Sequence, residues 1–413
     1  MMVRPRGPRG MPRASDAGFS LIEMLVATAI LLVVTGGIFS LLNPAHGTYR
    51  AQPEVSDMQQ RLRVAVDDLQ RDLVMAGAGT YSGPINGSLI NYFAPLLPYT
   101  VGTIVAGSPD NPDPSAITIM YVPPTNSQTT IRDDMPQNSA ELKVNAQPGC
   151  PTNNPLCGFE IGMRALIFDD LGNYDIFTVT QVQDDALHLQ HRDDRYTTAY
   201  DAGSYITEIM SRTYYLNRAE RRLYFFDGYK TNLPMVDNVV DLRFDYFGEP
   251  MPPALRRPVS DKDPKLGPWT TYGPKPPEMI KTNTKSDWGM GENCAFKVEN
   301  GQQVGRLENW LGGDPPGTLV PIPYSELSDG PWCPGYANPK GDPLPNRYDA
   351  DMLRVRQVRV TIRVQVGPDS LRGKNPAGQT LFVNPGSSRS AEGFVPDQEI
   401  RFDVTPRNMN IGR

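Results

Sequence analysis

The chain has few of the residue patterns on which enzyme and metal sites depend. Its 413 residues include three histidines and four cysteines, with no H-E-x-x-H metal motif and no G-x-S-x-G nucleophile elbow. The glycine-rich stretch 77–83 follows a helical pattern, whereas a dinucleotide loop needs a strand before its glycines. His188 and His191 lie three apart in an expected strand, so their side chains point to opposite faces. We therefore expect no catalytic residues, no cofactor and no metal.

Positive charge is also scarce. The chain has 40 Lys and Arg against 46 Asp and Glu, and without residues 1–18 the balance is 36 against 45, a net charge of −9. An acidic body argues against nucleic acid as a partner. Proline and glycine are abundant, but the apolar fraction of 39% and the strand patterns exclude wholesale disorder. We expect a folded protein with long loops and one large or two ordinary domains.

Long hydrophobic runs are absent with one exception, residues 19–42. As a helix, this run at about 1.5 Å per residue covers roughly 36 Å, enough to cross a bilayer. The leader before it, residues 1–18, holds Arg4, Arg6, Arg9 and Arg13 against Asp16. Such a basic leader should stay on the cytoplasmic side. Within and after the run we expect local softening at Gly36–Gly37 and a break or kink near Pro44.

The small residue that could mark a cut lies before this run. A secretory signal would place its small-x-small site after the run, but residues 43–47 are a poor match. Gly18 instead stands at the polar-to-apolar boundary and is followed by Phe19-Ser20-Leu21-Ile22-Glu23. This order resembles the class III signal of the type IV pilin superfamily. The resemblance implies cleavage by a prepilin peptidase between Gly18 and Phe19, and methylation of the new N-terminus at Phe19.

Glu23 is the sole charged residue between Phe19 and Leu42. A carboxylate inside a membrane costs on the order of several kcal/mol unless it finds a partner. The resemblance implies that the freed amine of Phe19 on a neighbouring subunit supplies the positive charge, which would make Glu23 an assembly residue. The alternative is that Glu23 lies in the first helical turn near the headgroups and only complements the helix dipole.

Residues 55–76 form a second helical pattern. Apolar residues recur at spacings of three and four along one stripe: Val55, Met58, Leu62, Ala65, Val66, Leu69 and Leu73. Gly77 and Gly79 are expected to end the helix. Residues 59–77 also resemble the stem of PilW-type minor pilins, which implies a helix that leaves the membrane and packs under a sheet.

Beyond the stem the pattern changes to alternating runs typical of strands. They cover 117–121, 164–168, 176–180, 206–216, 222–226, 236–247 and 355–366, and the order of the later runs also looks PilW-like. A helix followed by an antiparallel sheet is an α+β arrangement. We expect a leader (1–18), a transmembrane helix (19–42), a stem helix (43–77), a β-rich head (78–248), an insertion (249–349) and C-terminal strands (350–413).

The expected insertion is rich in proline and holds all four tryptophans. Disordered linkers are poor in aromatic residues, so we expect a folded elaboration with little regular structure. Its tryptophans, Trp269, Trp288, Trp310 and Trp332, would form either a small satellite core or an exposed recognition surface.

The four cysteines allow three disulfide connectivities. A domain outside the cytoplasm meets oxidising conditions, and we favour Cys150–Cys157 with Cys294–Cys333. Loop entropy would then contribute about 2.5 kcal/mol for the short loop and about 4 for the long one. Zinc is the alternative, but neither pair has C-x-x-C spacing and every histidine is distant in sequence.

Asp169, Asp170 and Asp175 surround an expected hairpin turn. Their spacing fits no EF-hand loop, so we interpret them as solvated turn carboxylates rather than calcium ligands.

The resemblance to PilW-type minor pilins implies a minor pilin of a type IV pilus, held in the inner membrane by one span with its head in the periplasm and later carried to the cell surface. Its expected partners are the prepilin peptidase, other pilin subunits and the inner-membrane assembly platform. The alternatives are a J-type minor pseudopilin of a type II secretion system and a membrane-tethered binding protein.

Overall fold

The computed structural model describes most of the chain from Phe19 onward. The described residues are 19–79, 94–101, 107–125, 127–169, 174–191, 196, 199–250, 292, 294, 296–307, 318–333, 348–367, 395, 397–406 and 409, with side chains of residues 40–51, 296 and 303 excepted. They form one long helix and mostly antiparallel sheets, which confirms the α+β prediction. Trp269, Trp288 and Trp310 lie outside these residues.

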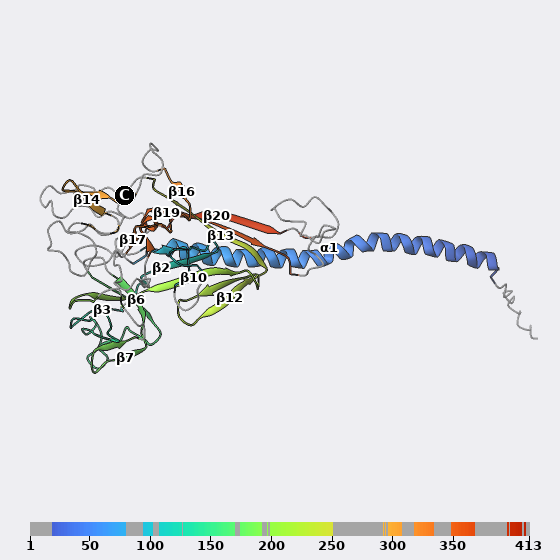
Figure 1. Cartoon of the computed structure of the whole chain (residues 1–413). Helices are drawn as coiled ribbons and strands as arrows, with labels where there is room; N and C mark the ends of the chain where they lie inside the picture. The colour runs from blue at the N-terminus through green and yellow to red at the C-terminus, as the bar shows by residue number, and fades with distance from the viewer. Residues whose placement is uncertain are drawn as a thin grey trace, which may run out of the picture.

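Helix α1 (Leu21–Met75) extends over 55 residues. Figure 1 shows that its N-terminal part projects alone, while its C-terminal part lies among the strands. Of the break or kink predicted near Pro44, the break is wrong, because the helix continues through this proline and through Gly36–Gly37. A kink near Pro44 stays a prediction. Proline removes one donor, but neighbouring turns can keep a long helix continuous. The expected end is confirmed: Gly77 and Gly79 follow the last turn with φ of 72° each.

Two sheets enclose the C-terminal part of α1. The first has the order β1 (Leu96–Leu97), β2 (Ala116–Tyr121), β10 (Met210–Asn217), β11 (Arg222–Phe226) and β12 (Asn232–Asp237). The second has the order β16 (Val320–Ile322), β13 (Val239–Gly248), β19 (Val355–Val364) and β20 (Gln398–Val404). Helix α1 contacts β2, β12, β19 and β20, so strands of both sheets cover its apolar stripe.

The stripe on α1 lies where the spacing of the sequence predicts. Met58, Leu62, Ala65, Leu69 and Leu73 are each at most 1% exposed and share one core with residues of both sheets. A continuous apolar face of this kind stabilises a helix mainly through tertiary packing.

A separate lobe is inserted between β2 and β10, which pair directly with Met210 opposite Tyr121. Its first sheet has the order β3 (Gln128–Thr130), β9 (Tyr205–Glu208), β5 (Arg164–Phe168) and β6 (Tyr174–Thr178). Its second has the order β4 (Glu141–Lys143), β8 (His188–Gln190) and β7 (Gln181–Gln183). Fourteen of its described residues are buried in a core of the lobe's own. In Figure 1 its strands lie at the end of the molecule opposite the projecting helix.

Two runs that the alternating pattern presents as single strands are each divided between sheets. The run 206–216 is divided at Ile209, whose N–H bonds the Arg164 carbonyl, so β9 belongs to the lobe and β10 to the first sheet. The run 236–247 is divided at Asn238, which has φ of 60°. Asparagine tolerates this left-handed conformation, which turns the chain from β12 into β13.

The expected insertion contains more regular structure than the sequence indicates. Its described residues include the hairpin β14 (Phe296–Glu299) and β15 (Gln302–Gly305), and the pair β17 (Trp332–Cys333) and β18 (Tyr348–Asp349). Strand β16 pairs with β13. Cys294, Leu307 and Leu327 also join the main core. This part of the segment is therefore built into the second sheet, and a 3₁₀ turn, η3 (Ala350–Arg354), leads back to β19.

Candidate functional site at the N-terminus and in the head

The first turn of α1 brings together Phe19, Ser20 and Glu23. The Phe19 side chain is 89% exposed and precedes the helix, while Gly18 lies outside the described residues. The Ser20 N–H and the Ser20 hydroxyl both donate to Glu23 Oε2, at 2.9 Å each, and the Glu23 N–H donates back to Ser20 Oγ at 3.3 Å. This arrangement is a capping box, which satisfies the open N–H groups of a helix start.

Ser20 is a site residue that the sequence reasoning missed. Its signal was present, because Ser20-x-x-Glu23 before an apolar run is the sequence form of a capping box. The cap holds Glu23 at the N-terminal end of the helix, close to where cleavage after Gly18 would create a new amine.

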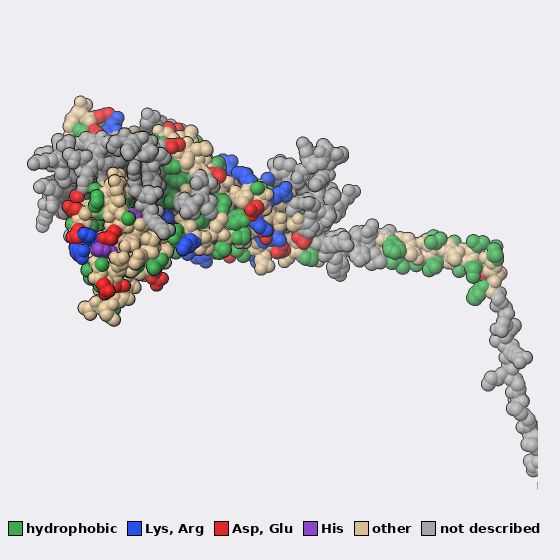
Figure 2. All heavy atoms as spheres, turned by 60° about the horizontal axis from the view of Figure 1, so that its bottom comes forward, with side chains coloured by type: hydrophobic (Ala, Val, Ile, Leu, Met, Phe, Trp, Pro, Cys, Tyr) green, Lys and Arg blue, Asp and Glu red, His purple; other side chains and the backbone are tan. Residues whose placement is uncertain are grey.

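The helix that follows is long and apolar enough to cross a membrane. This apolar stretch is Leu21–Phe39, 19 residues, and none of its residues is buried. Figure 2 shows apolar side chains along the visible face of this part of the helix, which projects from the body of the molecule. A helix that is apolar on every side and touches no protein core suits a lipid environment or a packed bundle of such helices.

Comparison with known families also identifies this N-terminal segment. Residues 13–39 match the family described as the prokaryotic N-terminal methylation motif. The chain carries a prepilin-type N-terminus. This N-terminus and its apolar helix support a membrane-anchored, type IV pilin-like or pseudopilin protein that a prepilin peptidase processes. No curated protein matches the chain significantly.

Farther along α1, a buried acid links the stem to the head. Asp72 is 2% exposed and accepts a hydrogen bond of 2.5 Å from the Tyr214 hydroxyl of β10. The guanidinium of Arg212 lies 3.5 Å from the same carboxylate. Burial, and then the negative charge of Asp72, raise the pKa of Tyr214 well above its ordinary value. Tyr214 therefore stays protonated and donates to Asp72.

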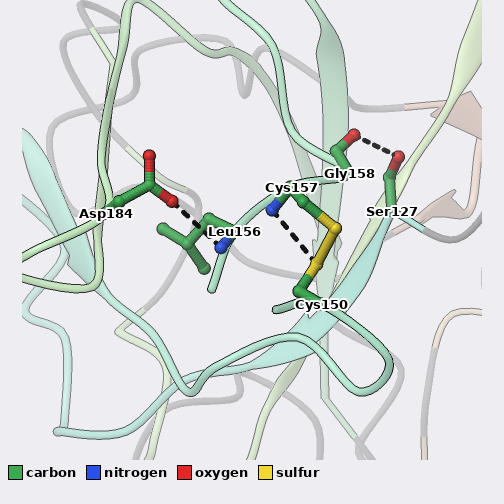
Figure 3. Close-up of a disulfide and its surroundings, with 6 residues drawn as sticks. All are labelled: Ser127, Cys150, Leu156, Cys157, Gly158 and Asp184. Carbon is green, nitrogen blue, oxygen red and sulfur yellow. Dashed lines mark hydrogen bonds between the residues drawn. A yellow bond between two sulfur atoms is a disulfide. The ribbon is translucent and has the colours of Figure 1, made fainter. Parts of the chain in front are cut away.

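Both predicted disulfides are present. Cys150 bonds Cys157 in the lobe, and Cys294 bonds Cys333 in the segment between β13 and β19, with Cα–Cα distances of 5.6 and 5.3 Å in the usual range. Figure 3 shows the first bond beside two loop contacts. The Asp184 carboxylate accepts from the Leu156 N–H at 3.1 Å, and Ser127 donates to the Gly158 carbonyl. The disulfide loop is thus tied to both lobe sheets.

The two lobe histidines lie in different surroundings. His188 Nδ1 lies 3.1 Å from the Glu141 carboxylate, whereas His191 is buried against the rings of Phe177 and Tyr196. Strand β8 ends at Gln190, so His191 lies just beyond the strand that the sequence predicts for both histidines.

The interpretation of Asp175 as a solvated turn carboxylate is wrong. Asp175 is 2% exposed in β6 and accepts a hydrogen bond of 2.8 Å from the Tyr200 hydroxyl. It is a buried acid with a partner distant in sequence, which local turn signals do not reveal. Asp169 is half-buried and Asp170 lies outside the described residues.

A second group of acids lies at the base of the segment between β13 and β19. Asp329, Asp349 and Asp351 place carboxylate oxygens within 4.8 Å of one another. This spacing alone would suit a cation, but Arg354 Nε already lies 2.8 Å from Asp351. Because a guanidinium supplies the positive charge, we assign no metal to this group. The sequence reasoning missed this group, since Asp329 is distant in sequence from Asp349, Asp351 and Arg354.

Proposed function

We propose that the chain is a PilW-like minor pilin, a non-catalytic subunit that is cleaved after Gly18 and assembled into, or used to prime, a type IV pilus. The match of residues 13–39 to the methylation motif supports this proposal most directly. A 55-residue helix whose exposed apolar part continues into a stem packed against sheets is the shape that such a subunit requires.

Assembly in this proposal depends on Glu23. In the unprocessed chain its partners are the two donors of Ser20. After cleavage, the methylated amine of Phe19 on a neighbouring subunit neutralises the carboxylate between packed helices. An unpaired acid in lipid is costly, so this pairing favours the assembled state. The head remains in the periplasm until the subunit joins the pilus.

Mass spectrometry of the chain from cells tests the processing step. We expect a chain that begins at N-methylated Phe19 in cells with an active prepilin peptidase. We expect Gly18→Trp to keep the leader, because a bulky side chain would occupy the cut site. A wild-type chain that retains Met1 or begins after Ala45 would remove the basis of the proposal.

Incorporation into sheared fibres tests the role of Glu23. Glu23→Gln removes the charge at nearly constant size, and we expect cleavage to continue while incorporation falls. Thr28→Val is a matched control in the same helix, because the Thr28 hydroxyl donates to the Met24 and Leu25 carbonyls in the preceding turn of that helix. Equal incorporation of Glu23→Gln and wild type would favour a membrane-tethered binding protein.

A pseudopilin of a type II secretion system is the second candidate, because it would have the same kind of N-terminal helix and stem. Deleting the gene distinguishes the pseudopilin from the minor pilin. Loss of surface pili supports the minor pilin, whereas loss of a secreted substrate with normal pili supports the pseudopilin. The lobe and the added strands make this head larger than a pseudopilin of that type requires, which favours the pilus.

A further inference from the structure

The base of the segment between β13 and β19 holds ionisable groups that the proposed function does not use. Asp349 and Asp351 are 1% and 4% exposed, and Arg354 is fully buried. Asp329 lies at the exposed rim of the same group. We call Asp329, Asp349, Asp351 and Arg354 the base cluster. Buried charges of this kind are rare in proteins unless they are paired.

The base cluster joins parts of the chain that are far apart in sequence. Asp349 accepts from the Gly330 N–H at 2.5 Å and from the Asp351 N–H at 2.9 Å. The Ala350 N–H donates to the Pro331 carbonyl at 2.8 Å, beside the pairing of β17 with β18. Arg354 Nη1 donates to the Pro250 carbonyl at 3.1 Å. The base cluster therefore contacts both ends of the segment, at Pro250 just after β13 and at Arg354 just before β19.

The charges of the base cluster do not balance when every acid is ionised. Among the described residues, three carboxylates face the guanidinium of Arg354. Glu326 adds negative charge from the turn after β16, and nearby Arg356 lies 3.6 Å from another acid, Glu249. Full ionisation would therefore leave excess negative charge in a buried site.

Protonation relieves this imbalance near neutral pH. Burial is the main cause that raises the pKa of Asp351 to about 8, with Asp349 and Asp329 adding to the effect against the opposing charge of Arg354. Burial likewise raises the pKa of Asp349 to about 6. Both acids therefore hold protons at pH values where an exposed aspartate has lost them.

We propose that the base cluster is a proton-dependent lock that keeps residues 329–333 and 348–354 closed against the end of the second sheet. With protons bound, the carboxyls keep their hydrogen bonds without mutual repulsion. When the protons leave, the negative charges repel and the base loosens while β13 and β19 stay paired. The lock is independent of the assembly role of the N-terminus.

The direction of the pH effect follows from proton linkage. Both acids have a higher pKa in the closed state than in an open, solvated one, so closing binds protons. The stability gained from this binding is fully present below about pH 4, falls as pH rises to about 8, and changes little above that value. For one linked proton, the equilibrium constant for opening rises by up to about tenfold per pH unit inside this window.

Hydrogen exchange of the full chain in detergent micelles, with EDTA present, measures this opening. Protection of amides in 329–333 and 348–354, corrected for intrinsic exchange rates, should fall at least tenfold between pH 5 and pH 8.5. Amides of β19 should lose much less. Asp351→Asn mimics the protonated acid and should flatten the pH dependence at the base.

Two further variants complete the experiment. Asp349→Asn should also reduce the pH dependence and provides a second test if Asp351→Asn folds poorly. Asp133→Asn changes a half-exposed lobe acid outside the base cluster and should keep the wild-type profile. A full pH dependence in both base variants would overturn the lock. Calcium that restores wild-type protection at pH 8.5 would also overturn it, because the cluster would then be a cation site.

Discussion

Ser20 shows at the scale of a single residue how the start of the helix and the acid Glu23 depend on each other. Its hydroxyl and N–H hold Glu23, and the Glu23 N–H holds the hydroxyl in return. The Glu23 carboxylate thus has a defined position within the first turn of its own helix.

Removing the hydroxyl should loosen this position. We expect Ser20→Ala to weaken the first turn by about 0.5–2 kcal/mol, the usual cost of losing an N-cap, and Ser20→Thr to retain most of the cap. Hydrogen exchange of the first-turn amides in micelles measures the difference. Equal protection in Ser20→Ala and wild type would show that the cap is not formed in the membrane-bound chain.

Tyr214 gives a second prediction at this scale. Tyr214→Phe leaves the buried Asp72 carboxylate without its hydroxyl donor, so we expect the free energy of unfolding to fall by about 1–3 kcal/mol. Tyr215→Phe is the matched control, because the Tyr215 hydroxyl bonds the exposed Asn232 and its loss should cost about 0.5 kcal/mol or less. Denaturant unfolding of the full chain in micelles compares the two, and equal losses would contradict the role of Asp72.

At the scale of elements, α1 combines two environments in one helix. Its N-terminal part is apolar all round, whereas its C-terminal part is apolar on one face and charged on the other. The difference in pattern decides which part can enter lipid and which part packs in a folded head.

A core substitution on the stem tests this division. Leu69 is fully buried between α1 and the sheets, and we expect Leu69→Ala to lower the free energy of unfolding by about 2–5 kcal/mol. Val64→Ala lies on the open face, where the side chain is 44% exposed, and should change stability by about 0.5 kcal/mol or less. A loss for Leu69→Ala no larger than that of the control would mean that the stem does not pack as observed.

Elements also show where sequence reasoning succeeds. The spacing of Met58, Leu62 and Leu69 determines the buried face of the stem, because helical period alone brings these residues together. The runs 206–216 and 236–247 show the opposite case. Their alternation continues, but the choice of sheet on each side of Ile209 and Asn238 depends on partners elsewhere in the chain.

The described residues form two cores, and the two disulfides relate to them differently. Cys150–Cys157 lies in the lobe, whereas Cys294 and Cys333 are buried in the main core. The loops that they close span sequence separations of 7 and 39 residues.

Replacing each cysteine pair by serine should therefore have unequal effects. Chain entropy predicts a loss of about 2.5 kcal/mol for the lobe bond and about 4 for the other, and the second pair also removes buried sulfur from the main core. Thermal unfolding of the oxidised full chain and of both double variants measures this order. A larger shift for Cys150→Ser with Cys157→Ser would contradict the assignment of the main core.

The sequence by itself determined the membrane helix, the Phe19 and Glu23 motif, the apolar stripe of the stem and the strand content, because each depends on residues near one another in the chain. It also indicated the disulfide pairing, which loop entropy favours by about 2.5 and about 4 kcal/mol for the two loops. Only the tertiary structure decided that a lobe interrupts the first sheet, that Asp175 is buried, and that Asp329 joins Asp349 and Asp351. Those features depend on contacts between distant residues, and local periodicity carries no information about which distant strands pair.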